Sequence, residues 1–375
     1  MAIKKEKEIQ KKMSTGIFNL VQDRHDFLLP HVIDLIKNKG WLNIQPEYQR
    51  RRVWNVKRKS KLIESILMNI PIPPIFLLET NYRDYEVMDG QQRLDALVSF
   101  FNDEFELTDL THWSELNGYS YGKLPSIVQR GLERRRISAI TVMVENFIDD
   151  KEKVDLRSLV FERLNTGGMQ LNSQEIRNCV YYGSFNNLLI ELSSLDLFTD
   201  VWGIPNHEGT DKISDELKEN ALFKRMGDCE IVLRFFAISE SSHLKDSLSK
   251  MMDECMKRNM DISNNELDKL KQKFIDALSL SKEVFGEDTF KLTNPESNRT
   301  YTLKNLYDAI MVVFYELKGK KEIILKNKKK IQKRIETFFS KQENFESLSR
   351  RKGNAKEIKE MKKIIKDIIL DVISS

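Results

Sequence analysis

Two patterns of apolar residues divide this chain of 375 residues. Up to about residue 180, strand-like runs such as residues 75–78 and 137–144 alternate with segments of helical spacing. Beyond about residue 183, apolar residues recur only at helical spacing. Such an order is typical of an α+β domain followed by a helical one. We therefore expect an α+β N-terminal domain over residues 28–182 and an all-helical C-terminal domain over residues 183–375.

The same spacing predicts individual elements. In the first domain we expect helices at residues 31–40, 57–68, within 119–136 and at 149–164, and strands at residues 41–45, 75–78 and 137–144. In the second domain we expect helices at residues 185–194, 214–240, 244–259, 264–285, 302–318, 321–339 and 354–373. Residues 1–27 are expected to form a charged lead-in.

Composition excludes several classes of protein. Hydrophobic residues make up 40% of the chain and charged residues 31%, which is typical of soluble globular proteins. No apolar run approaches the roughly 20 residues that span a bilayer, and the N-terminus lacks the apolar core of a signal peptide. Cys179, Cys229 and Cys255 are too scattered for a disulfide framework or a zinc knuckle. We expect a cytoplasmic protein with no membrane partner.

The segment Asp89-Gly90-Gln91-Gln92-Arg93 is the strongest candidate site. A strand-like run ends in an Asp-Gly turn and a helical pattern starts at once, so N–H groups are presented to anions at the positive end of a helix dipole. Arg93 offers a fork of donors for phosphate, and Gln91 and Gln92 add amide groups. Asp89 lies where it either caps the helix or holds a divalent cation. A capped helix with a solvated arginine is the alternative.

A second candidate is the basic segment Gln49-Arg50-Arg51-Arg52, which lies between Tyr48 and Trp54. Arginine beside tryptophan provides a phosphate-binding fork next to a stacking surface, as a nucleotide or nucleic-acid pocket requires. The alternative is that the two aromatic residues anchor the core and that the arginines are solvated.

A third candidate is the glycine-bearing segment 161–168. Two glycines just past a helix allow left-handed backbone and can form an anion-binding nest. A helix C-cap explains Gly167 or Gly168 fully, but it does not explain why Arg163, Asn165 and Thr166 lie beside it.

Lysine-rich segments at residues 318–334 and 350–366 alternate basic and apolar residues at helical spacing. The default interpretation is an apolar face that packs and a basic face that is solvated. The alternative is contact with the phosphate backbone of DNA, which would be salt-sensitive and independent of sequence.

Several catalytic motifs are missing from the sequence. The five histidines lie far apart, and there is no Walker-type loop, no nucleophile elbow and no CxxC pair. Nuclease chemistry through a histidine finger is therefore unsupported, whereas a divalent ion held by Asp89 together with phosphates stays open.

Four segments in order resemble the GmrSD-type N-terminal domain family of type IV restriction systems, which has a ParB/sulfiredoxin-like fold. They are residues 44–54, 65–74, 87–93 and 161–168, and residues 175–178 and 225–228 resemble later family positions. The resemblance covers about residues 28–240. It implies a nucleotide-binding domain, often with hydrolysis of a nucleoside triphosphate, that is used in bacterial defence against phage or modified DNA.

The resemblance also implies roles for individual residues. Gln91, Gln92 and Arg93 would bind and orient the phosphates, and Asp89 would act on Mg²⁺ or water. The remaining nucleotide-binding positions would be Gln49, Arg50, Arg52, Gly90, Arg163, Asn165, Thr166 and Gly167. Such phosphoryl chemistry works by positioning and charge neutralisation and needs no covalent nucleophile.

Full-length restriction members of the family carry a His-Asn-His-type nuclease domain, which this sequence replaces with lysine-rich helices. The first hypothesis is thus an NTPase whose nucleotide state controls engagement of DNA or a partner. The second is a non-catalytic module that binds DNA or nucleotide and recruits a separately encoded nuclease. A nicking endonuclease ranks last.

Overall fold

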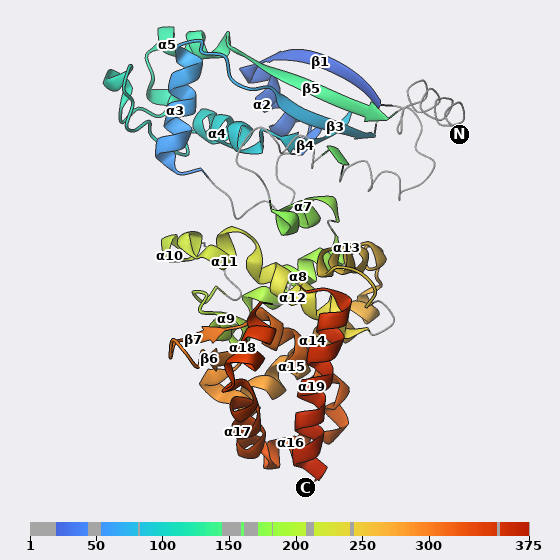
Figure 1. Cartoon of the computed structure of the whole chain (residues 1–375). Coiled ribbons are helices and arrows are strands. Elements are labelled where there is room, and N and C mark those ends of the chain that lie inside the picture. The colour runs from blue at the N-terminus through green and yellow to red at the C-terminus, as the bar shows by residue number, and fades with distance from the viewer. Residues whose placement is uncertain are drawn as a thin grey trace, which may run out of the picture. The chain divides into compact units, whose positions relative to one another are not determined.

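The computed structural model describes residues 20–43, 54–81, 83–144, 159–160, 172–181, 183–207, 214–240, 244–350 and 353–374. Backbone contacts divide the chain into two compact units, residues 1–171 and residues 172–375. The first unit combines a sheet with helices and the second is almost entirely helical (Figure 1). The expected α+β class is confirmed.

The first unit is built on a five-stranded sheet with the order β1-β5-β3-β4-β2. Its strands are β1 (Leu20–Leu28), β2 (Leu42–Asn43), β3 (Ile75–Asn81), β4 (Asp84–Asp89) and β5 (Arg136–Val144). The pairs β1–β5 and β3–β4 are antiparallel, whereas β3–β5 and β2–β4 are parallel. Strands β3 and β5 coincide with the apolar runs expected at residues 75–78 and 137–144, and they are rich in β-branched and other apolar residues.

Four helices pack on one face of this sheet. They are α2 (Leu29–Lys37), α3 (Val56–Leu67), α4 (Gln91–Phe101) and α5 (Ser126–Glu133). Their apolar stripes share a core with Leu77, Val87 and Ile137 of the sheet. Short 3₁₀ turns at residues 114–116 and 121–123 connect α4 to α5.

The lead-in expected over residues 1–27 is wrong from Leu20 onward, because residues 20–28 form strand β1. This strand is at the edge of the sheet, and most of its side chains are exposed. An edge strand needs no continuous apolar run, and the polar residues Asp23 to Asp26 hide it from a search for apolar spacing. Its partner β5 supplies the pairing that the local sequence does not indicate.

A buried carboxylate organises the loop between α4 and α5. One oxygen of Glu64 on α3 accepts the backbone N–H groups of Thr111, His112 and Trp113, at 2.8, 2.6 and 3.1 Å. Burial opposes ionisation of Glu64, but these donors outweigh it, and the pKa of the carboxyl is lowered. The charged form of Glu64 therefore fastens the loop to α3.

We expect Glu64→Gln to lower the free energy of unfolding by about 1–3 kcal/mol at neutral pH, because charge-assisted hydrogen bonds are lost. Since the folded-state pKa is lowered, this contribution is complete above the ordinary value of 4.5 and is lost as pH falls through the folded-state pKa. Urea denaturation of both proteins from pH 7 downward measures this difference. A gap that stays constant through the acid range would contradict the assignment. Glu106→Gln, which affects only an exposed pair with Lys123, is the control.

The second unit consists of helices joined by short turns. These are α7 (Ser173–Val180), α8 (Ser184–Ser194), α9 (Asp196–Trp202), α10 (Asp215–Glu219), α11 (Ala221–Lys224), α12 (Gly227–Ser239), α13 (Leu248–Arg258), α14 (Asn264–Phe285), α15 (Lys304–Glu316), α16 (Lys321–Lys326), α17 (Lys328–Phe339), α18 (Gln342–Ser349) and α19 (Ala355–Ser374). Helices α12 and α15 are buried along most of their length and form the centre of the core.

The second unit departs from the expectation in two respects. A hairpin of β6 (Lys291–Thr293) and β7 (Thr300–Thr302) interrupts the helices, and three residues per strand are too few to register as a periodic signal. The single helix expected at residues 214–240 is three helices. Asn220 caps α11 through its side chain, and Met226 takes a left-handed conformation before α12, so the chain turns twice.

None of the helices in the described ranges is both long and apolar enough to cross a bilayer.

Candidate functional site

The β4–α4 junction holds all five residues of the DGQQR segment. Strand β4 ends at Asp89, and α4 begins at Gln91. Phe76 pairs with Asp89 and Leu77 with Val87, so β4 contains an extra residue in a β-bulge just before its end. A bulge twists the strand locally and redirects the side chains that follow. The carboxylate of Asp89 is consequently presented at the end of the sheet, with 54% of its side chain exposed.

Gly90 makes the sharp turn between strand and helix. Its φ of +98° is left-handed, and a Cβ atom at this position would lie 2.5 Å from the Cγ2 methyl of Ile75. Gly90 is the N-cap residue of α4 and has no side chain to cap it, and the hydrogen bond shown for the Asp89 carboxylate is the one that it accepts from Arg93. Backbone geometry, rather than a side-chain cap, starts the helix.

Arg93 is buried beneath the junction, with 9% of the residue exposed. Its Nη1 donates to the carbonyl of Pro73 at 2.7 Å, and its Nη2 donates to Asp89 Oδ2 at 2.7 Å and to the carbonyl of Pro74 at 3.4 Å. The guanidinium therefore links the proline loop before β3 to the last residue of β4. Its expected contact with phosphate stays a prediction, and the structure adds a second role, that of fixing Asp89.

Asp89 accepts from Arg93 through Oδ2 alone, and Oδ1 has no hydrogen bond among the described residues. A carboxylate with one oxygen fixed and one directed to solvent fits a cation that is otherwise held by phosphates and water, as Mg²⁺ is in nucleotide sites. No cluster of three or more acidic, histidine or cysteine ligands occurs in the described part of the chain. Mg²⁺ at Asp89 thus stays a prediction that depends on phosphate.

Gln92 connects the junction to the start of α3. Its Oε1 accepts the backbone N–H of Trp54 at 2.9 Å. Trp54 follows the arginine segment 50–52 by two residues in the sequence, and the guanidinium of Arg58 lies 4.6 Å from its ring. The amide therefore fixes the chain that follows the arginine segment at the N-terminus of α4. Gln91, at the first position of that helix, is half-buried.

Buried Lys59 joins α3 to α4 a turn further along. Its Nζ lies 2.8 Å from Asp95 Oδ2 and 3.0 Å from Ser99 Oγ. Sequence reasoning missed Lys59 and Asp95 as supports of the site. A lysine near a helix start gives no sign of burial, and only the i,i+4 spacing of Asp95 and Ser99 marks a polar row on α4.

Two of the predicted clusters fall on residues that the structure does not describe. They are Gln49, Arg50 and Arg52 of the arginine segment, and Arg163, Asn165, Thr166 and Gly167 of the glycine-bearing segment. Their roles stay predictions.

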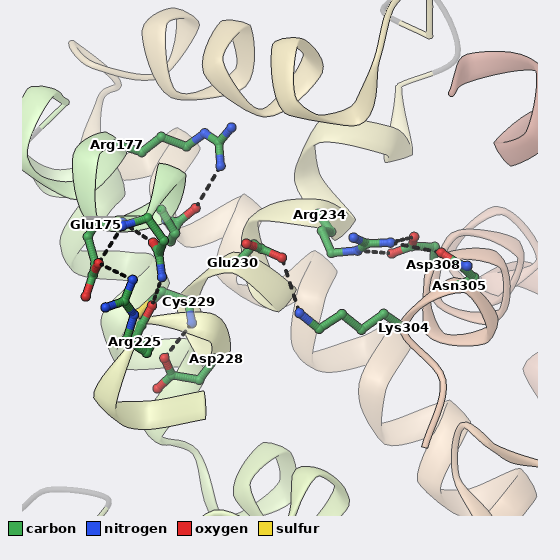
Figure 2. Close-up of polar contacts among 12 residues, drawn as sticks. Glu175, Arg177, Arg225, Asp228, Cys229, Glu230, Arg234, Lys304, Asn305 and Asp308 are labelled. Carbon is green, nitrogen blue, oxygen red and sulfur yellow. Dashed lines mark hydrogen bonds and ion pairs between the residues drawn. The ribbon is translucent and has the colours of Figure 1, made fainter. Parts of the chain in front are cut away.

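The later family-like segments lie side by side in the second unit (Figure 2). The side chain of Asn172 donates to the carbonyl of Arg225 at 2.7 Å, and the Arg225 guanidinium lies 3.4 Å from Glu175. Arg177 donates to Asp253 at 2.6 Å. These contacts, together with the capping box of Asn172 and Glu175, fasten α7 to the turn before α12 and to α13. Residues 175–178 and 225–228 therefore contribute contacts that stabilise the second unit.

The first unit is thus a mixed α+β domain in which a glycine turn places the N-terminus of a helix beside an acidic residue at the end of a strand. Residues 31–182 match the model of the family described as GmrSD restriction endonuclease, N-terminal domain. Residues 31–182 therefore form a domain of this family, and the match suggests a protein related to restriction and defence. No curated protein and no solved structure matches it, so the finer likeness to ParB and sulfiredoxin stays a prediction.

Proposed function

We propose that this protein binds and hydrolyses a nucleoside triphosphate at the β4–α4 junction, and that nucleotide state controls its engagement of DNA or of a partner protein. The observation that carries the proposal is the hydrogen bond from Trp54 to Gln92. It ties the chain that follows the arginine segment to the helix N-terminus next to Asp89. Arginines, helix N–H groups and a half-exposed carboxylate would then converge on one phosphate chain.

The proposed roles divide between groups that touch the nucleotide and groups that hold those groups in place. Gln91 would contact phosphate or the attacking water, and Asp89 would hold Mg²⁺ through Oδ1. A bound Mg²⁺ would neutralise charge that develops on the phosphate oxygens. Gln92 and Arg93 would act as positioning residues, because their side-chain groups already bind Trp54, Asp89 and the proline loop.

In this proposal the pocket is completed by two segments that lie outside the described residues. Gln49, Arg50 and Arg52 would close over the triphosphate, and Arg163, Asn165, Thr166 and Gly167 would complete the site from the other segment. This set supplies charge and directed donors without a covalent nucleophile, which is sufficient for phosphoryl transfer to water.

Asp89→Asn is expected to reduce phosphate release by roughly 100-fold or more, because an uncharged amide holds Mg²⁺ much more weakly than a carboxylate and still leaves the junction in place. Isothermal titration with the four NTPs and Mg²⁺, combined with a phosphate-release assay, compares this variant with wild type. Asp84→Asn, at the other end of β4, is the matched control and should behave as wild type. If wild type binds none of the four nucleotides, the proposal is overturned.

The second candidate is a non-catalytic module that binds nucleotide or DNA and recruits a separate nuclease. The contacts of Arg93 within the protein favour this second candidate. Its guanidinium already binds Asp89 and two backbone carbonyls, so it stabilises the fold without any substrate. Nucleotide binding without phosphate release in wild type, and equal binding in Asp89→Asn, would decide for this alternative.

A further inference from the structure

The two basic segments at the C-terminal end differ in how their charges are arranged. On α19, Lys362 and Lys366 both pair with Glu316, and the exposed Lys359 and Lys363 are interleaved with Glu360 and Asp367. Positive charge on α19 is thus balanced locally.

Helix α17 is different. Residues 318–341 contain ten lysines or arginines and two glutamates. Ile331, Ile335 and Phe339 form its buried row and pack into the core of the second unit. The outward side carries two adjoining i,i+4 rows, Lys329 with Lys333 and Lys330 with Arg334, and all four residues are exposed.

None of these four cations forms an ion pair with another described residue, and the exposed Glu336, one turn from Lys333, is the only acidic residue of α17. Lys321 and Lys328 nearby turn toward Glu283, the former at 2.8 Å to its carboxylate and the latter at 3.5 Å to its carbonyl. By contrast, no acidic group of the described residues lies within ion-pair distance of the outward rows of α17.

This arrangement costs the helix stability. Like charges at i,i+4 are each destabilising by about 0.2–0.5 kcal/mol. Lysines at residues 328–330 also occupy the first turn, where the helix dipole favours acidic residues. Several other helices of this unit follow that preference, with Glu175 on α7, Glu266 on α14 and Glu357 on α19, whereas α8, α11, α13 and α15 have no acidic residue there. A helix that keeps charges unfavourable to its own stability is typical of a functional surface.

We propose that the outward face of α17, formed by Lys329, Lys330, Lys333 and Arg334, binds the phosphate backbone of duplex DNA. Flexible ammonium groups and one guanidinium on a single exposed helix face suit a regular polyanion and read no bases. The inference gives a location to the DNA partner of the proposed function and does not depend on nucleotide hydrolysis.

The test compares two variants from which equal charge has been removed. The α17 variant carries Lys329→Gln, Lys330→Gln, Lys333→Gln and Arg334→Gln. The control variant carries Lys269→Gln, Lys356→Gln, Lys359→Gln and Lys363→Gln, which are also exposed positions of the second unit. Glutamine matches lysine in helix propensity, so both variants should fold, and circular dichroism checks this.

Fluorescence anisotropy of a short labelled DNA duplex, measured between about 50 and 200 mM salt, gives the affinity and its salt dependence. The α17 variant should bind at least about tenfold more weakly. Its salt slope should be smaller by about 3–4, because each phosphate that the protein no longer neutralises reduces the slope by about 0.9. The control variant should stay close to wild type. Equal weakening in both variants, or no duplex binding by wild type, would overturn the proposal.

Two further measurements distinguish this DNA site from a lipid-binding surface and from the nucleotide site. Preferential binding of wild type to anionic lipid vesicles, abolished in the α17 variant, would overturn the DNA assignment. Nucleotide titration of the same α17 variant distinguishes the two proposals. If the α17 variant binds nucleotide but no longer binds DNA, the α17 site is supported. If the wild-type protein binds DNA through α17 but binds no nucleotide, the α17 site is still supported and the proposed function fails.

Discussion

Asp308→Ala is expected to lower the free energy of unfolding by about 3–5 kcal/mol, because it leaves the guanidinium of Arg234 buried without its counter-charge. Arg234 on the central helix α12 makes a bidentate contact with Asp308 on α15, and it also donates to Asn305 at 3.2 Å (Figure 2). Burial raises the pKa of Asp308 and the neighbouring guanidinium opposes that shift. The ion pair therefore fixes the position of α12 relative to α15.

Hydrogen–deuterium exchange of peptides from α12 and α15 is the suitable measurement, because it reports on this core independently of the first unit. Faster exchange should be confined to the second unit. Arg234→Met combined with Asp308→Leu should recover most of the stability, since an apolar pair of similar volume replaces both charges. Glu287→Ala, which removes only an exposed pair with Lys282, is the control. Protection equal to wild type in Asp308→Ala would contradict the role of the pair.

Gly90→Ala is expected to destabilise the first unit by about 2–5 kcal/mol and to abolish nucleotide binding. The left-handed backbone costs an alanine about 1–2 kcal/mol, and overpacking adds about 1–3 kcal/mol. The overpacking arises because the new methyl would lie 2.5 Å from Cγ2 of Ile75, a β-branched side chain on the buried strand β3 that has little freedom to move.

Two other glycines of the same unit separate these causes. Gly118 has a φ of +85° and no atom within 4 Å of a Cβ, so Gly118→Ala should cost only the backbone strain. Gly131 lies in α5 with open space around it, and Gly131→Ala should stabilise by about 0.5–1 kcal/mol. Thermal and urea unfolding should rank the three variants from least to most stable as Gly90→Ala, Gly118→Ala and Gly131→Ala. A Gly90→Ala protein as stable as Gly118→Ala would show that Ile75 gives way.

The elements that the sequence predicted well are those whose local and tertiary preferences agree. Helix α14 spans residues 264–285 as expected, because a capping box at Ser263 and a long apolar stripe define it locally. Strand β3 begins at Ile75 as expected, after prolines that end the preceding helix. The expected helix at residues 149–164 lies mostly outside the described residues. The helix expected at residues 321–339 is divided at Asn327 into α16 and α17.

Elements that depend on a distant partner were missed. Strand β1 is polar and exists through its pairing with β5. Helices α9 and α18 are short, and their apolar residues become a stripe only against the core that receives them. Composition within a short window carries no information about such partners.

The candidate site divides in the same way. The sequence alone determined that a glycine turn joins a strand to a helix N-terminus at Asp89 to Arg93, because only local backbone geometry and apolar spacing are involved. That Arg93 donates to the proline loop and to Asp89, and that Gln92 binds Trp54, follows from the three-dimensional fold and not from the local sequence. These partners are between 4 and 38 residues away in the chain, and the folded sheet brings them within hydrogen-bond distance. Likewise, the lysines of α17 are plain in the sequence, but the packing of its apolar row against the core determines which of them face solvent without an ion-pair partner.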